Sequence, residues 1–211
     1  MLRSATVALA LMALPLSAAA ATDLAWDTLT GTTLHFASLP VIGASSGSID
    51  VFALALVFTT GASGTVSSVT VPIAAGLGAP EMVFALFADG GSAPGSALGT
   101  AVQVTTTADP ASPDLATLSG WGGAALTSGS DYWLVASIAD PTTGGLWFAG
   151  SPDQAGERFF SADGGTSWSE GFGTIPLARI EVERVPPVPL PAGLPLLAGG
   201  LLLIRAVRRR A

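Results

Sequence analysis

The chain contains no cysteine and no lysine, and it has only one histidine among its 211 residues. The lack of cysteine excludes a disulfide framework and thiol chemistry. Zinc is also disfavoured, because protein zinc sites are built mainly from cysteine and histidine. Any Ser-His-Asp triad would depend on His35 alone. We interpret His35 as an ordinary strand residue, and we predict no cofactor, no metal site and no catalytic residue.

Positive charge is scarce in the middle of the chain. All eight basic residues are arginines, and five of them lie close to the chain ends. The other three, Arg158, Arg179 and Arg184, stand against all 15 acidic residues, so the middle of the chain has a net charge of −12. Such an acidic segment argues against nucleic acid and anionic lipid as partners.

The first 21 residues have the three parts of a secretory signal peptide. Arg3 supplies the positive charge, Ala5 to Leu16 is apolar, and Ser17 to Ala21 contains mostly small residues. This combination predicts export and cleavage near Ala20 or Ala21. We therefore assign residues 1–21 to a signal peptide and exclude them from the predicted domain, residues 22–184.

An apolar run of 17 residues, Val188 to Ile204, lies near the C-terminus and is followed by arginines. As a helix it would reach about 25 Å, at the short limit for a bilayer core of about 30 Å. Residues 192–211 are predicted to form a transmembrane helix with a cytoplasmic tail. The Pro-rich residues 185–191 before it are predicted to be an extended spacer. The arginines that would stop transfer across the membrane are Arg205, Arg208, Arg209 and Arg210.

The motif Val188-Pro189-Leu190-Pro191-Ala192, the apolar run and the arginine cluster resemble PEP-CTERM sorting signals, in their Val-Pro-Leu-Pro-Ala variant. The resemblance implies recognition by an exosortase, a membrane-embedded cysteine transpeptidase, which cuts near the motif. It also implies a Gram-negative bacterium, an inner-membrane precursor, and a final place on the cell surface or in an extracellular polysaccharide or biofilm matrix. A plain tail anchor with a Pro-rich neck is the alternative.

The domain between these signals has strand patterns and no convincing amphipathic helix. Apolar residues alternate with polar ones, or fill both faces of short runs, which is typical of β-strands. Seven residues are expected in the core: Met82, Phe84, Leu86, Leu134, Ile138, Ile180 and Val182. Strands are predicted at Ile49–Phe58, Thr65–Ile73, Met82–Phe87, Ala101–Thr105, Leu115–Ser119, Tyr132–Ile138, Leu146–Ala149, Arg158–Ser161 and Leu177–Glu183.

Turn residues recur every eight to fifteen residues, a spacing that favours a β-sandwich or jelly roll. We therefore predict a single all-β domain. The segment Thr105 to Gly123 is expected to be a long loop around a short strand. Turns are predicted at Thr60-Gly61, Gly90-Gly91, Pro94-Gly95, Ser128-Gly129, Gly144-Gly145 and Gly164-Gly165.

The domain contains, in order, the segments Val57–Gly61, Thr65–Val71, Leu86–Gly91, Ala93–Gly95, Leu126–Leu134 and Trp147. This order resembles the choice-of-anchor exported domains of bacteria, in particular the R type, over Ser48 to Val182. The resemblance implies a β-sandwich and an exported protein, and it carries over no activity and no functional residue.

Two of the five tryptophans, Trp121 and Trp168, lie beside Gly-rich turns and could stack on a sugar ring. Folding back over the end of the sandwich is the alternative for both. The sequences Asp89-Gly90-Gly91 and Asp163-Gly164-Gly165 predict hairpin turns, with calcium loops as the alternative. The acids Asp153, Glu157, Asp163 and Glu170 are candidates for a hydrolytic pair only through their proximity in sequence.

The leading functional hypothesis is a non-enzymatic protein of the cell surface or extracellular matrix. Its expected partners are an exosortase-type processing enzyme, the inner membrane and extracellular polysaccharide. The alternative is a carbohydrate-binding module that uses Trp121 and Trp168. A secreted glycan hydrolase is the third hypothesis, and no local motif supports it.

Overall fold

The computed structural model describes residues 21–30, 38–42, 53–150, 156–171 and 173–184. They belong to one compact unit, residues 21–185, which we call the body. The signal peptide up to residue 20, most of the Pro-rich spacer, the sorting motif and the predicted membrane helix lie outside the described residues.

The described part of the body is all-β, as the sequence patterns predict. It contains strands and turns but no helix, and so no helix that could cross a membrane. The strands are β1 (Thr22–Asp27), β2 (Ser38–Ile42), β3 (Ala53–Thr59), β4 (Gly64–Leu77), β5 (Glu81–Asp89), β6 (Pro94–Thr105), β7 (Asp114–Leu118), β8 (Ala125–Leu126), β9 (Asp131–Ile138), β10 (Gly144–Phe148), β11 (Glu157–Ser161), β12 (Ser169–Gly171) and β13 (Arg179–Glu183).

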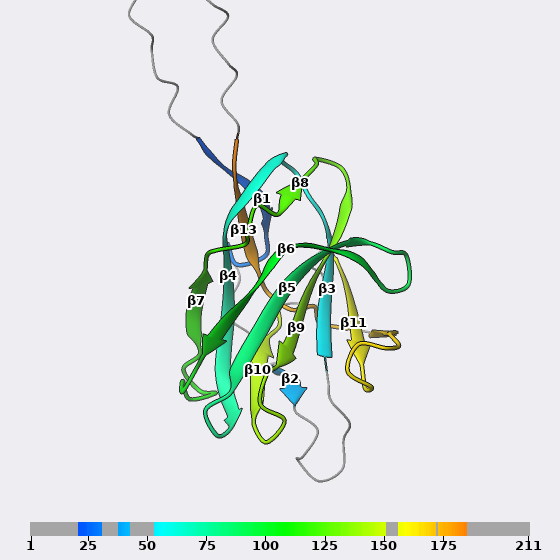
Figure 1. Ribbon diagram of the computed structural model, residues 1–211. Coiled ribbons are helices and arrows are strands. Elements are labelled where there is room, and N and C mark those ends of the chain that lie inside the picture. Colours follow the sequence, from blue (N-terminus) through cyan, green and yellow to red (C-terminus); the bar gives the residue numbers. More distant parts are fainter. Residues whose placement is uncertain (1–20, 31–37, 43–52, 151–155, 172, 185–211) are drawn as a thin grey trace, which may run out of the picture. The chain divides into compact units, whose positions relative to one another are not determined.

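The strands form two antiparallel sheets that make a β-sandwich (Figure 1). The first sheet has the order β1-β13-β4-β10-β2, and β7 and β8 also pair with the long strand β4. The second sheet has the order β12-β11-β3-β9-β5-β6. Strand neighbours are often distant in sequence, which explains why turn spacing alone does not determine this topology.

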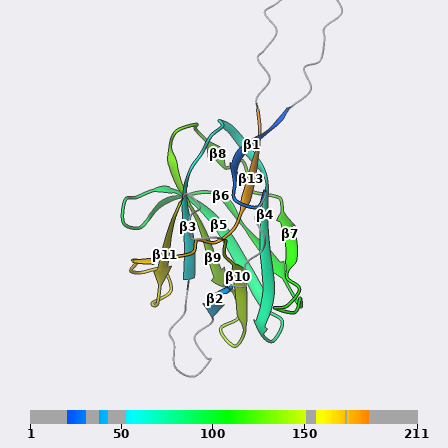
Figure 2. The same cartoon turned by 180° about the vertical axis from the view of Figure 1, so that it is seen from behind.

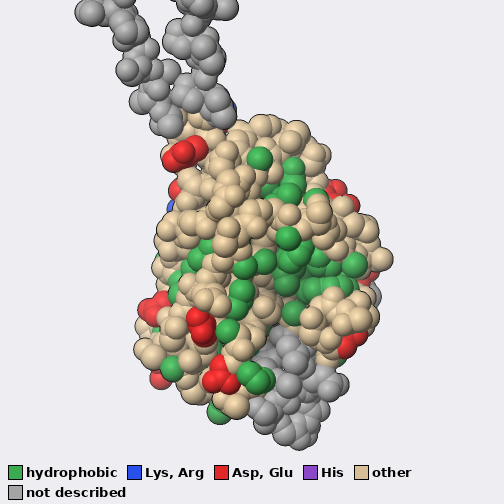
Figure 3. All heavy atoms as spheres, in the orientation of Figure 1, with side chains coloured by type: hydrophobic (Ala, Val, Ile, Leu, Met, Phe, Trp, Pro, Cys, Tyr) green, Lys and Arg blue, Asp and Glu red, His purple; other side chains and the backbone are tan. Residues whose placement is uncertain are grey.

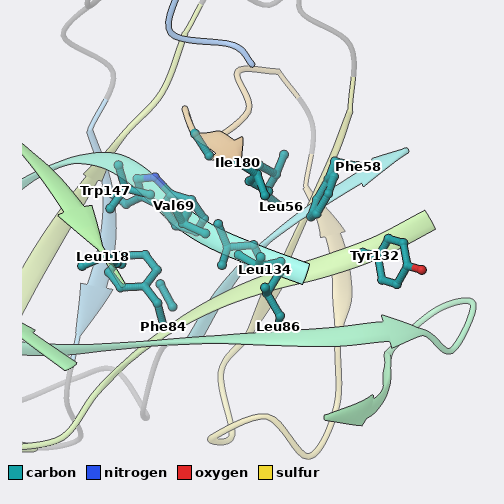
Figure 4. Close-up of a cluster of buried hydrophobic side chains, with 14 of the residues drawn as sticks. Leu56, Phe58, Val69, Phe84, Leu86, Leu118, Tyr132, Leu134, Trp147 and Ile180 are labelled. Atoms are coloured by element: carbon teal, nitrogen blue, oxygen red, sulfur yellow. The ribbon is translucent and has the colours of Figure 1, made fainter. Parts of the chain in front are cut away.

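The main core lies between the two sheets (Figure 4). Alternation places every second residue of a strand on its inward face. The rings of Phe84 in the second sheet and Trp147 in the first meet edge to face, with centroids 5.3 Å apart. The seven residues predicted to be core are all buried, and this prediction is confirmed.

The predicted strand Ile49–Phe58, which is apolar on both faces, corresponds to β3, an inner strand of the second sheet. It pairs with β11 on one side and β9 on the other. Leu54, Leu56 and Phe58 belong to the main core. Ala53 and Ala55 belong to a second, smaller apolar cluster. Residues 49–52 of the predicted strand lie outside the described residues.

Two predicted turns are wrong. Pro94-Gly95 begins β6, and Gly144-Gly145 begins β10. Gly145 is buried, and a Cβ at this position would lie 2.6 Å from the Met82 sulfur, so close packing explains this glycine. Four short or terminal strands were not predicted: β1, β2, β8 and β12.

The two ends of the body lie side by side at one end of the sandwich (Figures 1 and 2). Thr22 of β1 pairs with Glu183 of β13, and the Arg184 backbone N–H donates to the Ala21 carbonyl at 2.9 Å. Arg184 also forms an ion pair with Asp23. Strands β1 and β13 are therefore held to each other at this end of the body.

Candidate functional site

The outward face of the second sheet carries the second apolar cluster. Its buried members are Ala53, Ala55, Trp133, Val135 and Phe159, contributed by β3, β9 and β11. The register aligns Phe159, Ala55, Val135 and Ala85 in one row across four strands. Figure 3 shows hydrophobic side chains gathered on the side of the molecule where β3, β5 and β11 lie. An outward sheet face is ordinarily polar, so this patch needs an explanation.

Trp133 lies at the centre of this outward cluster and is nevertheless fully buried. Its ring packs against Phe159, with centroids 4.6 Å apart, and meets Trp168 edge to face, with centroids 5.7 Å apart. Its indole N–H donates to Asp89 Oδ1 at 2.9 Å. This bond and the Gly91 backbone N–H lower the pKa of Asp89. Trp133 thus joins β9 to the β5–β6 hairpin.

The loop between β11 and β12, residues 162–168, is held together by Asp163, and we call it the aspartate loop. The Ser167 hydroxyl and backbone N–H donate to the Asp163 carboxylate at 2.6 and 2.8 Å. The Ser161 hydroxyl donates to it at 2.7 Å. These donors, the Ser167 side chain foremost, lower the pKa of Asp163 to about 2.

The aspartate loop holds Trp168 in place. The Trp168 indole N–H donates to the Gly165 carbonyl at 3.1 Å, and its ring meets Trp133 at an interplanar angle of 76°. Gly164 and Gly165 have φ values of 74° and 94°, a left-handed conformation that glycine adopts readily. A tryptophan fixed in this way loses little conformational entropy when a ligand stacks on it.

A groove of about 430 Å³ lies between the aspartate loop and the β5–β6 hairpin, and we call it the outer groove. Its floor is formed by small or apolar residues of β3, β5 and β9, with Trp168 on one side and Pro94 on the other. All of its lining residues are uncharged. They are Ala53, Ala85, Phe87, Ala93, Pro94, Val135, Ser137, Gly164, Gly165, Thr166 and Trp168.

The predicted sugar platform of Trp121 with Trp168 is wrong. Trp121 is only 2 % exposed and belongs to the main core between the sheets, where its indole N–H donates to the Leu118 carbonyl at 3.1 Å. Trp168 packs against the outward cluster instead. Trp121 matches the alternative of a loop tryptophan folded over the sandwich, while half-buried Trp168 lines the outer groove.

The two Asp-Gly-Gly segments form turns, and their carboxylates bind groups of the protein. Asp89 accepts from Gly91 and Trp133, and Asp163 accepts from Ser161 and Ser167. Within the described ranges, His, Asp and Glu residues form no group of three or more that could hold a metal ion.

A second hollow, of about 410 Å³, contains two of the body's acids, Asp131 and Glu157. They lie on β9 and β11, on opposite sides of β3, where Asp131 pairs with Thr59 and Glu157 with Val57. Strand β3 therefore lies between the two strands that carry these acids. Asp131 also accepts a hydrogen bond from the Thr59 hydroxyl at 2.6 Å.

Residues 43–47, Gly-Ala-Ser-Ser-Gly, have the Gly-x-Ser-x-Gly spacing of a hydrolase nucleophile. That motif works at a turn from a strand into a helix. The segment lies outside the described residues, as do His35 and Asp153. The described strands on either side of it, β2 and β3, belong to an all-β body.

The residues of the predicted sorting signal are also outside the described part of the chain. They are Val188, Pro189, Leu190, Pro191 and Ala192 of the motif, and Arg205, Arg208, Arg209 and Arg210 of the membrane stop.

No family model matches the chain, and no match was found among curated proteins or solved structures.

Proposed function

We propose that the chain is an exported, non-enzymatic protein of the cell surface or extracellular matrix, delivered by an exosortase-type sorting signal. One observation carries the proposal: the body is closed by β1 and β13, and the Arg184–Ala21 hydrogen bond lies at both junctions with the predicted signals. Cleavage after residue 20 or 21 and cleavage near Val188 would therefore leave the paired strands of the body whole.

The mature protein, on this proposal, is the β-sandwich with a short Pro-rich tail. Asp131 in the second hollow accepts a hydrogen bond from the Thr59 hydroxyl, which supports a structural role for this acid. Display on a surface also agrees with a body net charge of −12, which keeps exported copies soluble and apart.

The sorting motif can be tested by replacing Pro189 and Pro191 with alanine in the full chain, expressed in a Gram-negative host that has an exosortase-type enzyme. We expect the double variant to accumulate as a membrane-bound precursor, while wild type is cut near the motif. The matched control replaces Pro186 and Pro187, which lie in the same spacer outside the motif, and it should be processed normally. Membrane fractionation and the intact mass of the C-terminal peptide are the measurements.

Normal cleavage of the Pro189/Pro191 variant would contradict the proposal. Loss of cleavage in both variants would show that spacer stiffness, and not the motif, determines processing. Replacing all three of Arg208, Arg209 and Arg210 by lysine should preserve retention of the protein in the membrane. Replacing all three by glutamine should impair it, because the expected membrane stop depends on positive charge.

A further inference from the structure

The outer groove has a shape and chemistry that its structural role leaves unexplained. Its volume of about 430 Å³ lies within the range of roughly 300–1,000 Å³ that is typical of small-ligand sites. The second apolar cluster around Trp133 is already packed against Trp168. The packing of this cluster therefore does not explain why a groove is left open beside Trp168. We propose that the outer groove binds one or two neutral pyranose rings of a polysaccharide, with Trp168 as the stacking wall.

Trp168 supplies the apolar contact that such a ligand needs. A pyranose ring has a face of C–H groups, and an indole ring offers a broad, rigid surface to it. The Trp168 N–H is already bound to the Gly165 carbonyl, so the orientation of the ring is set before any ligand arrives. The edge-to-face contact with Trp133 also fixes it.

Polar groups lie beside this wall, where the hydroxyl edge of a sugar would sit. Ser137 on the floor is half-buried, and its hydroxyl makes no hydrogen bond to any described residue. Thr166 donates its hydroxyl to the Asp163 carbonyl at 3.2 Å and keeps its oxygen lone pairs for a ligand donor. An apolar wall with a few polar groups is the pattern of a small-ligand site, and these hydroxyls are suited to the hydroxyl groups of a sugar.

Charge and shape decide between a glycan and a second copy of the chain. Every lining residue is uncharged, whereas the body around the groove has a net charge of −12. Two such bodies repel each other, and so do the body and an acidic polysaccharide, but a neutral glycan is unaffected. Residues of the aspartate loop and of the β5–β6 hairpin line the groove together with its floor, which favours a narrow ligand over the flat sheet of a second copy.

The proposal concerns the body in solution and is independent of how the protein is exported. The test uses the purified full chain in a detergent that has no sugar headgroup. It is titrated calorimetrically with neutral pentasaccharides of glucose, mannose and galactose and with an oligouronate of the same length. At least one neutral sugar should bind, with an affinity that changes little with salt. The oligouronate should bind more weakly.

Two variants remove the site in different ways. Trp168→Ala removes the wall, and Ala85→Leu fills the floor without touching the aspartate loop; each should weaken binding about tenfold or more. The matched controls are Leu115→Ala, at a side chain that is 59 % exposed on β7, and Ala125→Leu on β8, and both should bind like wild type.

Four outcomes would overturn the proposal. They are no binding of any neutral pentasaccharide at millimolar concentration, unchanged binding in Ala85→Leu, and tighter binding of the oligouronate. The fourth is self-association in analytical ultracentrifugation that Ala85→Leu abolishes, because it would assign the groove to a second copy of the chain.

Discussion

Asp163 shows how one exposed carboxylate can organise a loop. Its oxygens accept from Ser161 and Ser167, and these bonds lower its pKa from 3.8 to about 2. A carboxyl whose pKa is lower in the folded state stabilises that state at pH values above its unfolded pKa. This contribution is lost as the pH falls from about 4 through about 2.

We therefore expect the difference in unfolding free energy between wild type and Asp163→Asn to be constant above pH 4 and to shrink as the pH falls towards 2. Asparagine keeps the size of the side chain but cannot titrate, so the difference isolates Asp163 from Asp27, Asp89 and Asp140, whose pKa values are also lowered. Urea unfolding at several pH values, followed by tryptophan fluorescence, measures it. A difference that does not change with pH would contradict the assigned role.

The tryptophans show how far the burial of a residue can be predicted from its local sequence. Trp133 and Trp147 lie within predicted strands, and both are fully buried. Trp121 and Trp168 have the same local context, a Gly-rich turn, yet one is in the main core and the other lines a groove. The partners that decide this, β6 and Trp133, are distant in sequence, so local pattern could not separate the two.

At the scale of elements, β6 depends on one glycine. Gly99 has a φ of 67°, and a Cβ there would lie 1.9 Å from the Trp121 carbonyl oxygen. That carbonyl accepts from the Thr100 backbone N–H at 3.0 Å, which joins β6 to the loop that carries Trp121. The conformation and the close approach both require glycine.

Gly99→Ala should lower the unfolding free energy by at least about 2 kcal/mol, from the strain of a left-handed residue and the lost hydrogen bond. Gly91→Ala is the matched control, because Gly91 has a φ of 85° but nothing lies within 4 Å of its would-be Cβ. The control should cost about 1 kcal/mol, for strain alone. Equal losses for the two variants in chemical denaturation would show that the Trp121 contact is unimportant.

Much of the sheet structure was predictable because strands follow a period of two. The nine predicted strands all correspond to observed ones, although many bounds differ. Strand β6 was predicted from Ala101 but begins at Pro94, since Pro-Gly normally signals a turn and here occupies an edge strand. The outer groove was not predictable, because its residues come from four strands and two loops that only the register brings together.

At the scale of the whole molecule, β1 matters more than its short and partly polar sequence indicates. It covers one edge of β13 over five paired positions, buries Ala25, and contributes Asp27 to an ion pair with Arg179 at 3.1 Å. A chain that begins at Thr28 would leave that edge of β13 open, and open edges promote aggregation.

We expect the chain that begins at Thr28 to be less stable than the chain that begins at Ala21 by at least about 3 kcal/mol. Several ladder hydrogen bonds are lost, each worth about 0.5–1.5 kcal/mol. Denaturation midpoints of the two otherwise identical proteins, with light scattering to follow aggregation, measure the effect. Equal midpoints would mean that β1 contributes little to the stability of the body.

The pairing of the two ends has a mechanical consequence. A load applied at Arg184 and directed along β13 would be resisted by bonds on both sides of that strand, to β1 and to β4. Those hydrogen bonds lie perpendicular to the direction of pull. They must therefore break at the same time and not one after another. If the body is held at its C-terminal end against flow, the load therefore falls on β13, which is hydrogen-bonded to a neighbouring strand on each side.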